Sequence, residues 1–167
     1  PTRISYTGLS LGGIVGGSHI HFVNDLRTAS LVVPGGVITR LLLDSQTFGP
    51  RIKAGVTGSL AENSFNYNLF FRDFQAVIDS GDPINHIRDA VNIHPVHLIK
   101  VLNDTVVPNS ATDRLIAQGP LRKLKTLGPN AVSAGNGGYT FFSKGSHGSL
   151  FDPSASLAAT VEMQRQS

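Results

Sequence analysis

The sequence predicts an α/β fold with a parallel sheet, because short apolar segments typical of strands alternate with segments of helical character. The predicted strands cover residues 4–7, 28–33, 96–102 and 139–143. Strands separated by helices pair in parallel, since a parallel pair needs a long crossover connection. The carboxyl ends of the strands are then expected at one edge of the sheet, where open α/β sheets bind ligands.

Helix boundaries are predicted from capping residues. The first helix is expected from residue 11 to about residue 24, with a glycine-rich first half. A capping box at Ser110–Asp113 is expected to open the helix that follows the third strand. Asp152 and Pro153 are expected to cap and begin the last helix, which continues over 157–164.

A long insertion separates the second and third predicted strands. Residues 37–92 are many more than a simple crossover helix needs, and their pattern is mostly helical. The sequence therefore predicts an α/β core made from residues 1–36 and 93–167, with a helical cap or lid at 37–92. Within the insertion, apolar residues recur at the three- and four-residue spacing of an amphipathic helix. These residues are Phe65, Leu69, Phe70, Phe74, Val77 and Ile78.

The insertion is also rich in phenylalanine. Many of these side chains are expected to pack on the sheet, but their number exceeds what one crossover needs. We therefore predict a lid that lines an apolar acyl pocket, with Phe70, Phe74 and Leu42 as substrate-binding residues. The phenylalanines are Phe48, Phe65, Phe70, Phe71 and Phe74.

Length and composition limit the classes of protein that fit. A chain of 167 residues is long enough for one domain with a sizeable core. The formal charge of +3 comes from scattered Lys and Arg without the interleaved aromatic residues of single-stranded nucleic acid binding. No nucleic-acid partner is expected, while weak contact with anionic lipid surfaces stays open. The absence of cysteine excludes disulfides and thiolate sites.

The segment Gly8-Leu9-Ser10-Leu11-Gly12 has the form Gly-x-Ser-x-Gly and directly follows the first predicted strand. In this motif a sharp strand-to-helix turn exposes a nucleophilic serine hydroxyl. Small residues on both sides are expected because neighbouring backbone passes too close for larger side chains. The backbone N–H of Leu11, at the start of the next helix, is expected to stabilise an oxyanion.

Two further candidate catalytic residues also follow predicted strands. Asp104 comes just after the third strand, and His147 just after the fourth. A serine hydroxyl is a poor nucleophile at neutral pH, so His147 is expected to take the proton of Ser10. Asp104 is expected to orient the imidazole and stabilise its charged form. The chain order Ser…Asp…His is that of the α/β-hydrolases.

Each assignment has an alternative. Asp104 is also typical of a turn or a helix cap, and His147 of a glycine-rich loop. Asp113 and Asp152 are rival acids, although both are better explained by helix capping. His19 and His21 are two residues apart, which is the wrong spacing for a shared metal on a helix, so no metal or cofactor is expected.

Six segments together carry a resemblance to a known family. They are 8–13, 33–36, 47–50, 79–85, 103–109 and 145–150. In this order they resemble the C-terminal half of bacterial extracellular lipases and phospholipases of the α/β-hydrolase fold, which have a Gly-x-Ser-x-Gly-Gly elbow. The resemblance implies hydrolysis of carboxylic esters in lipids, with Ser10 as nucleophile, Asp104 as acid and His147 as base. It also implies a location outside the cell or on its surface.

A complete α/β-hydrolase has further strands before the nucleophile strand, and a loop after one of them gives the second oxyanion donor. Only nine residues precede Ser10 here. Losing one such donor costs about 2.7–4 kcal/mol of transition-state stabilisation, and the first strand would have an unpaired edge. We therefore expect the missing N-terminal half either as a second polypeptide left by proteolytic nicking or as a part that this sequence lacks. The alternative is pairing of two copies through that edge.

The substrate stays open at this stage, because fold and triad do not determine it. The leading prediction is a lipase, phospholipase or esterase. The same triad also serves thioesterases, short-chain carboxylesterases, polyester depolymerases and serine peptidases. From another class, the alternative is a catalytically silent binding module with a hydrolase fold.

Overall fold

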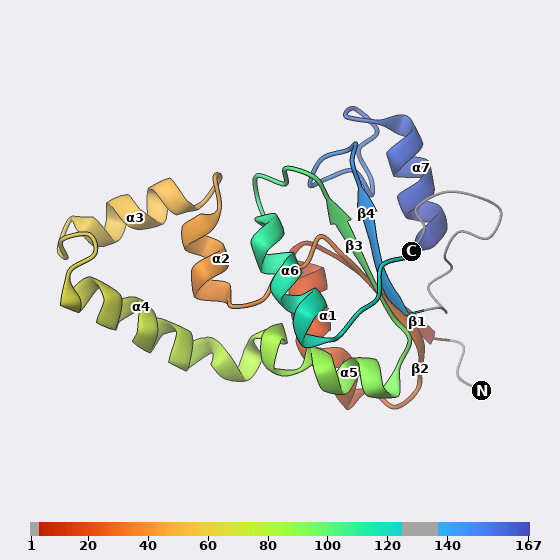
Figure 1. Cartoon of the computed structure of the whole chain (residues 1–167), viewed down its shortest axis with the longest axis horizontal. Helices are drawn as coiled ribbons and strands as arrows, with labels where there is room; N and C mark the ends of the chain where they lie inside the picture. The colour runs from red at the N-terminus through yellow and green to blue at the C-terminus, as the bar shows by residue number, and fades with distance from the viewer. Residues whose placement is uncertain (1–3, 125–136) are drawn as a thin grey trace.

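A parallel sheet lies at the centre of the structure (Figure 1), a computed structural model that describes residues 4–124 and 137–167. In the described residues the sheet has four strands in the order β1-β2-β3-β4, and each neighbouring pair is parallel. The predicted α/β fold with a parallel sheet is confirmed. The strands are β1 (Ile4–Leu9), β2 (Leu26–Val32), β3 (Val96–Val101) and β4 (Gly138–Phe142).

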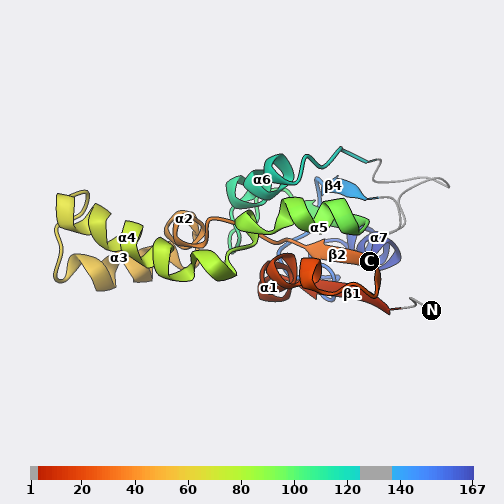
Figure 2. The same ribbon diagram turned by 90° about the horizontal axis from the view of Figure 1, so that it is seen from below.

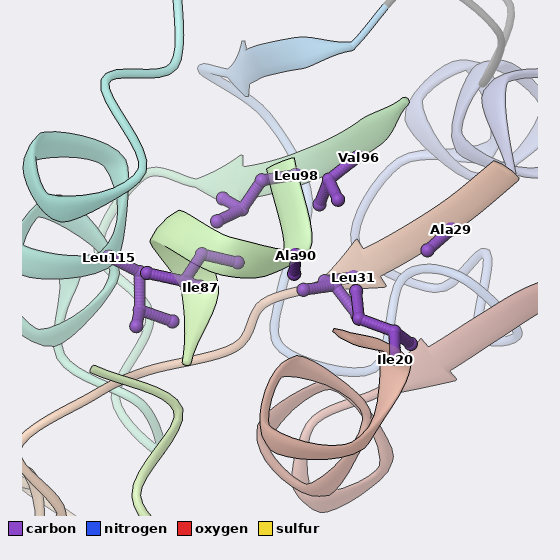
Figure 3. Packing of buried hydrophobic residues seen from close by; sticks show 8 residues of the cluster. All are labelled: Ile20, Ala29, Leu31, Ile87, Ala90, Val96, Leu98 and Leu115. Atoms are coloured by element: carbon purple, nitrogen blue, oxygen red, sulfur yellow. The ribbon is translucent and has the colours of Figure 1, made fainter. Parts of the chain in front are cut away.

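Helices cover both faces of this sheet, because alternate residues of each strand point to opposite sides. On one face Leu31 and Leu98 pack with helical residues in a fully buried cluster (Figure 3). On the other face Val32 and Ile99 pack against Met163. Because both faces of the sheet are buried, β2 and β3 each present apolar side chains to both sides. The first cluster consists of Ile20, Ala29, Leu31, Ile87, Ala90, Val96, Leu98 and Leu115.

Three helices lie on the first face: one follows the serine turn, one lies at the end of the insertion and one follows β3. The last helix covers the other face. The predicted helix from residue 11 ends earlier than expected, at His19, and a short 3-10 turn continues it. These elements are α1 (Leu11–His19), η1 (Ile20–Phe22), α5 (Ile87–Ile93), α6 (Asn109–Gln118) and α7 (Leu157–Gln166).

Two predicted helix starts are wrong. The helix α6 begins at Asn109, after Pro108, and no side chain caps it, so Ser110–Asp113 is not a capping box. The last helix is capped by Ser156, whose hydroxyl accepts from the N–H of Ala159, and Asp152 caps only a local turn by accepting from the N–H of Ser154. Both errors have one cause, since Ser, Asp and Asn stabilise turns by the same hydrogen bonds that cap helices.

Most of the insertion extends away from the sheet (Figures 1 and 2). The helix predicted from the phenylalanine spacing is confirmed as α4 (Phe65–Ile78). Two 3-10 turns lead from α4 to α5, which packs on the sheet. The remaining elements are α2 (Ile38–Asp44), α3 (Gly49–Thr57), η2 (Asp79–Gly81) and η3 (Pro83–Asn85). Among the helices of the described residues, none is long and apolar enough to span a lipid bilayer.

Candidate active site

Ser10 occupies a strained turn between β1 and α1. Its backbone angles are φ 55° and ψ −117°, a region that L-residues rarely adopt. The N–H of Ser10 donates to the carbonyl of Val32 at 2.9 Å, and the carbonyl of Ser10 accepts from Ile14 at 2.9 Å. Strain of this kind costs about 1–3 kcal/mol and persists only where the surroundings impose it. Here the neighbouring strand and the first helical turn hold the serine in place.

The glycines around Ser10 do not all have the expected role. A Cβ on Gly8 would lie 2.5 Å from the carbonyl carbon of Gly12, and one on Gly13 would lie 3.0 Å from the carbonyl oxygen of Gly8. A Cβ on Gly12 would meet nothing within 4 Å. The expectation of crowding on both sides of Ser10 is therefore wrong at Gly12, because the close approach involves Gly8 and Gly13 instead.

We expect Gly8→Ala and Gly12→Ala to have opposite effects. The first forces a methyl group into backbone and should lower the free energy of unfolding by about 1–3 kcal/mol. The second should raise it by up to about 1 kcal/mol, because alanine favours a helix over glycine. Urea unfolding of both variants measures the difference, and an equal loss of stability would contradict the packing described for Gly12.

Ser10, His147 and Asp104 form one hydrogen-bonded chain. The imidazole Nε2 of His147 lies 2.7 Å from the Oγ of Ser10, and its Nδ1 lies 2.7 Å from the Oδ2 of Asp104. An ionised carboxylate only accepts hydrogen bonds, so Nδ1 of His147 donates to Asp104. In the neutral imidazole Nε2 is then an acceptor, and the hydroxyl of Ser10 donates a hydrogen bond to it. This is the arrangement that a serine nucleophile needs.

The carboxylate of Asp104 is fixed on its other side by backbone. Its Oδ1 accepts from the N–H groups of Val106 at 2.9 Å and Val107 at 3.0 Å. The side chain of Asp104 is only 1% exposed, whereas that of His147 is 18% exposed. The acid is therefore buried and oriented, while the imidazole stays accessible to a substrate.

The two rival acids and two other histidines have contacts away from Ser10. Asp113 pairs with Lys100, and Asp152 accepts from the backbone of Ser154. His97 is completely buried, and burial lowers its pKa to about 4. His21 stacks on His86, with ring centroids 4.7 Å apart. In the described part of the chain, no group of three His, Cys, Asp or Glu residues is placed to hold a metal.

Leu11 is the first residue of α1. The first N–H groups of a helix have no partner within the helix, and the helix dipole favours negative charge beside them. The N–H of Leu11 directly follows the nucleophile, so it is available as one oxyanion donor. Its side chain is 68% exposed and plays no part in the core.

The three predicted substrate-binding residues lie in two places. Leu42 packs beside the buried cluster that includes Ile14, one turn of α1 beyond Ser10. Phe70 and Phe74 lie on α4, which extends from the sheet, and their rings stack with centroids 6.4 Å apart. Both rings remain exposed, by 45% and 39%. A cavity of about 440 Å³ lies within the insertion and has both polar and apolar lining residues. Phe70 and Phe74 are not among them.

Sequence reasoning missed the residues that hold the turn of Asp104. The amide of Asn109 donates to the carbonyl of Val101 at 2.6 Å and accepts from the N–H of Asn103 at 3.1 Å. Asn103 itself has φ 57°, which asparagine tolerates better than most residues. The pair Asn103-Asp104 therefore contained a signal for this turn, but nothing local pointed to Asn109.

A parallel sheet with a serine turn after β1, an aspartate after β3 and a histidine after β4 corresponds to part of the α/β-hydrolase fold. Solved structures of similar fold support this assignment. Acylaminoacyl peptidase from Pyrococcus horikoshii is similar to 98% of this chain, with a TM-score of 0.58 and 16% identity. Acetyl xylan esterase 1 from a Thermoanaerobacterium species matches 99% of the chain, with a TM-score of 0.57 and 13% identity.

A putative dienelactone hydrolase from Klebsiella pneumoniae matches 98% of the chain, with a TM-score of 0.54 and 12% identity. The chain spans about half or less of these proteins, namely 22% of the peptidase, 46% of the esterase and 49% of the dienelactone hydrolase. No protein-family model matches the sequence, and no curated protein does so. The lipase resemblance, the second chain and the extracellular or cell-surface location stay predictions.

Proposed function

We propose that this chain carries the nucleophile, base and acid of a serine hydrolase that cleaves carboxylic esters of lipids. The observation that supports this most directly is the chain of two 2.7 Å contacts from Ser10 through His147 to Asp104. The strained serine and the N–H of Leu11 at the start of α1 support it further, because a nucleophile and an oxyanion donor are both needed.

The proposed reaction passes through an acyl-enzyme. As the Oγ of Ser10 attacks the ester carbonyl, Nε2 of His147 takes the hydroxyl proton, and Asp104 stabilises the imidazolium. The oxyanion receives a hydrogen bond from the N–H of Leu11. His147 then gives its proton to the departing alkoxide, and the C–O bond of the ester breaks. In the second half, His147 takes a proton from water, whose oxygen attacks the acyl carbon. His147 then gives this proton to the Oγ of Ser10 as the bond between Oγ and the acyl carbon breaks, which releases the carboxylic acid and restores the serine hydroxyl.

The preference for long acyl chains is proposed from the exposed face of α4. Phe70, Phe74 and Val77 are spaced by four and three residues, so they form one apolar stripe along the helix. Val77 is 78% exposed. A ligand that covers this exposed stripe gains about 25 cal/mol of binding free energy per Å² of apolar surface removed from water. An acyl chain of a lipid has the chemistry to do this.

We expect long-chain esters to depend on this stripe and short-chain esters not to. With p-nitrophenyl decanoate, the double variant F70A/F74A should lose about tenfold in kcat/KM, the equivalent of burying about two methylenes. With p-nitrophenyl acetate the rate should change less than about twofold, because acetate does not reach the stripe. Steady-state kinetics with the two esters measures this.

Phe65→Ala is the matched control. Phe65 is 79% exposed on the same helix but lies on the opposite side from Phe74, so its loss should leave both esters unaffected. Hydrolysis confined to acetate and butyrate would contradict the lipid substrate and favour a short-chain esterase. Equal losses with F65A and with F70A/F74A would contradict the acyl-binding role of the stripe.

A further inference from the structure

The position of the catalytic acid depends on the turn at residues 103–107, called here the acid turn. Oδ1 of Asp104 is bound to the N–H groups of Val106 and Val107, and Oδ2 is bound to Nδ1 of His147. The two oxygens belong to one rigid carboxylate. Any displacement of the acid turn therefore moves the oxygen that orients the imidazole.

Asn109 holds only the beginning of this turn, and the buried side chain of Val107 packs the end of it against Ile14 and Ala111. Asn109 bonds to the backbone of Val101 and Asn103, so it fixes the end of β3 and the entry to the turn. Asn109 does not bind the carbonyls of Thr105 and Val106, which come later in the acid turn.

Those two carbonyls are bound from the insertion. The Oγ of Ser45 donates to the carbonyl of Val106 at 2.7 Å. The N–H and the Oγ1 of Thr47 both donate to the carbonyl of Thr105, each at 3.1 Å. Figure 1 shows the connection between α2 and α3, which contains Ser45 and Thr47, beside the loop from β3 to α6. The Oγ of Ser45 also lies 3.4 Å from the carbonyl of Thr105, so four hydrogen-bond contacts join the insertion to the acid turn.

Ser45 is also built firmly into the insertion. Its N–H donates to the carbonyl of Leu41 at the end of α2, and its carbonyl accepts from Gly49 at the start of α3. Its Oγ accepts from the N–H of Phe48 at 3.1 Å, and the residue is only 2% exposed. A buried hydroxyl with both a donor and an acceptor partner has a fixed orientation, because losing either bond leaves a buried polar group unsatisfied.

We propose that Ser45 is a positioning residue of the catalytic acid, through which the helical insertion sets the orientation of Asp104 and His147. This inference rests on the proposed function, because it concerns the efficiency of the same triad. Its physical basis is that a displacement of about 1 Å at a catalytic group can cost about 100-fold in rate. The insertion then acts on the chemistry through the acid turn, in addition to any contact with substrate.

Ser45→Ala tests the proposal, with Ser64→Ala as the matched control. Ser64 is a second capping serine of the insertion, and its Oγ accepts from the N–H of Tyr67 at 3.2 Å, at the start of α4. With p-nitrophenyl acetate, Ser45→Ala should lower kcat about tenfold and leave KM within about twofold, since the loss is confined to the transition state. Ser64→Ala should leave both within about twofold. An unchanged kcat in Ser45→Ala, or equal losses in the two variants, would overturn the proposal.

A double-mutant cycle shows whether Ser45 acts through Asp104. In the background of Asp104→Asn the acid no longer orients the imidazole, so adding Ser45→Ala should change the residual rate by less than about twofold. A second tenfold loss in that background would place the action of Ser45 elsewhere and overturn the proposal.

A measurement that needs no turnover separates this inference from the proposed function. The proton on Nδ1 of His147, hydrogen-bonded to Asp104, should give a far-downfield NMR signal in the wild-type chain. We expect Ser45→Ala to broaden or shift this signal and Ser64→Ala to leave it in place. If a fluorophosphonate fails to label Ser10, the proposed function is wrong, and this signal still decides the role of Ser45. An identical signal in Ser45→Ala and wild type would overturn that role.

Discussion

Ser10→Ala is expected to lower kcat for ester hydrolysis by about 10⁴–10⁶-fold, the range found when a triad nucleophile is removed. The physical reason is that no other group replaces the Oγ that contacts Nε2 of His147 at 2.7 Å. KM should change little, because alanine leaves the surrounding surface intact. A fluorophosphonate probe should label the wild-type chain at Ser10 and leave Ser10→Ala unlabelled, as read by mass spectrometry of peptides.

Ser18→Ala is the control for this variant. Ser18 lies on α1, the helix that follows Ser10, and its hydroxyl donates to the carbonyl of Gly81 at 2.6 Å, away from the triad. It should retain the wild-type kcat and full labelling at Ser10. Urea unfolding of Ser10→Ala should give a free energy of unfolding within about 0.5 kcal/mol of wild type, since no buried contact is lost. Labelling at another serine, or turnover by Ser10→Ala near the wild-type rate, would contradict the assignment of the nucleophile.

The triad was predictable because each of its members has a local signal. Ser10 lies in a motif whose glycine spacing describes a turn, and Asp104 and His147 each follow an apolar segment. The rule that parallel strands end at one edge then brings the three together without any knowledge of contacts. The structure places them within hydrogen-bonding distance, as this rule predicts.

The contacts of the insertion were not predictable in the same way. Ser45 bonds to Val106, 61 residues away, and no pattern in the sequence links the two. Likewise, the spacing of Phe70 and Phe74 predicts an apolar helix face but cannot tell whether the sheet covers it. The prediction of helix caps failed for a related reason, since Asp152 fits the sequence pattern of a helix cap but stabilises a local turn instead.

The buried carboxylate of Asp82 caps a nearby turn and also binds residues that are distant in the sequence. Asp82 precedes Pro83 and caps the short turn η3, because it accepts from the N–H of Ile84. It also accepts from the N–H of Val37 at 3.1 Å and of Ile38 at 2.7 Å, and from the amide of Gln75 at 2.8 Å. The residue is fully buried. It thereby joins the beginning of the insertion to its end.

Asp82→Ala should therefore lower the free energy of unfolding by about 3–5 kcal/mol. Three backbone N–H groups and one side-chain amide would lose their acceptor in a buried site, and hydrogen bonds to a charged group are worth about 1.5–3 kcal/mol each before relaxation. The loss is made larger by Val37, whose φ of 57° is unfavourable for a β-branched residue and is held by its bond to Asp82. Urea unfolding followed by circular dichroism measures the change.

Asp82→Asn and Asp79→Asn complete this experiment. Asparagine at 82 keeps one acceptor oxygen but turns an N–H group toward other donors, so we expect a smaller loss of about 2 kcal/mol. Asp79 is exposed and shares Gln75 as a partner, and its change should stay within about 0.5 kcal/mol. Amide exchange at Val37 and Ile38 should accelerate in Asp82→Ala, because the start of α2 is then free to open. Because Ser45 directly follows the end of α2 at Asp44, the same variant should also disturb the acid turn. If the unfolding midpoint and these two amides stay unchanged in Asp82→Ala, the carboxylate does not anchor the insertion.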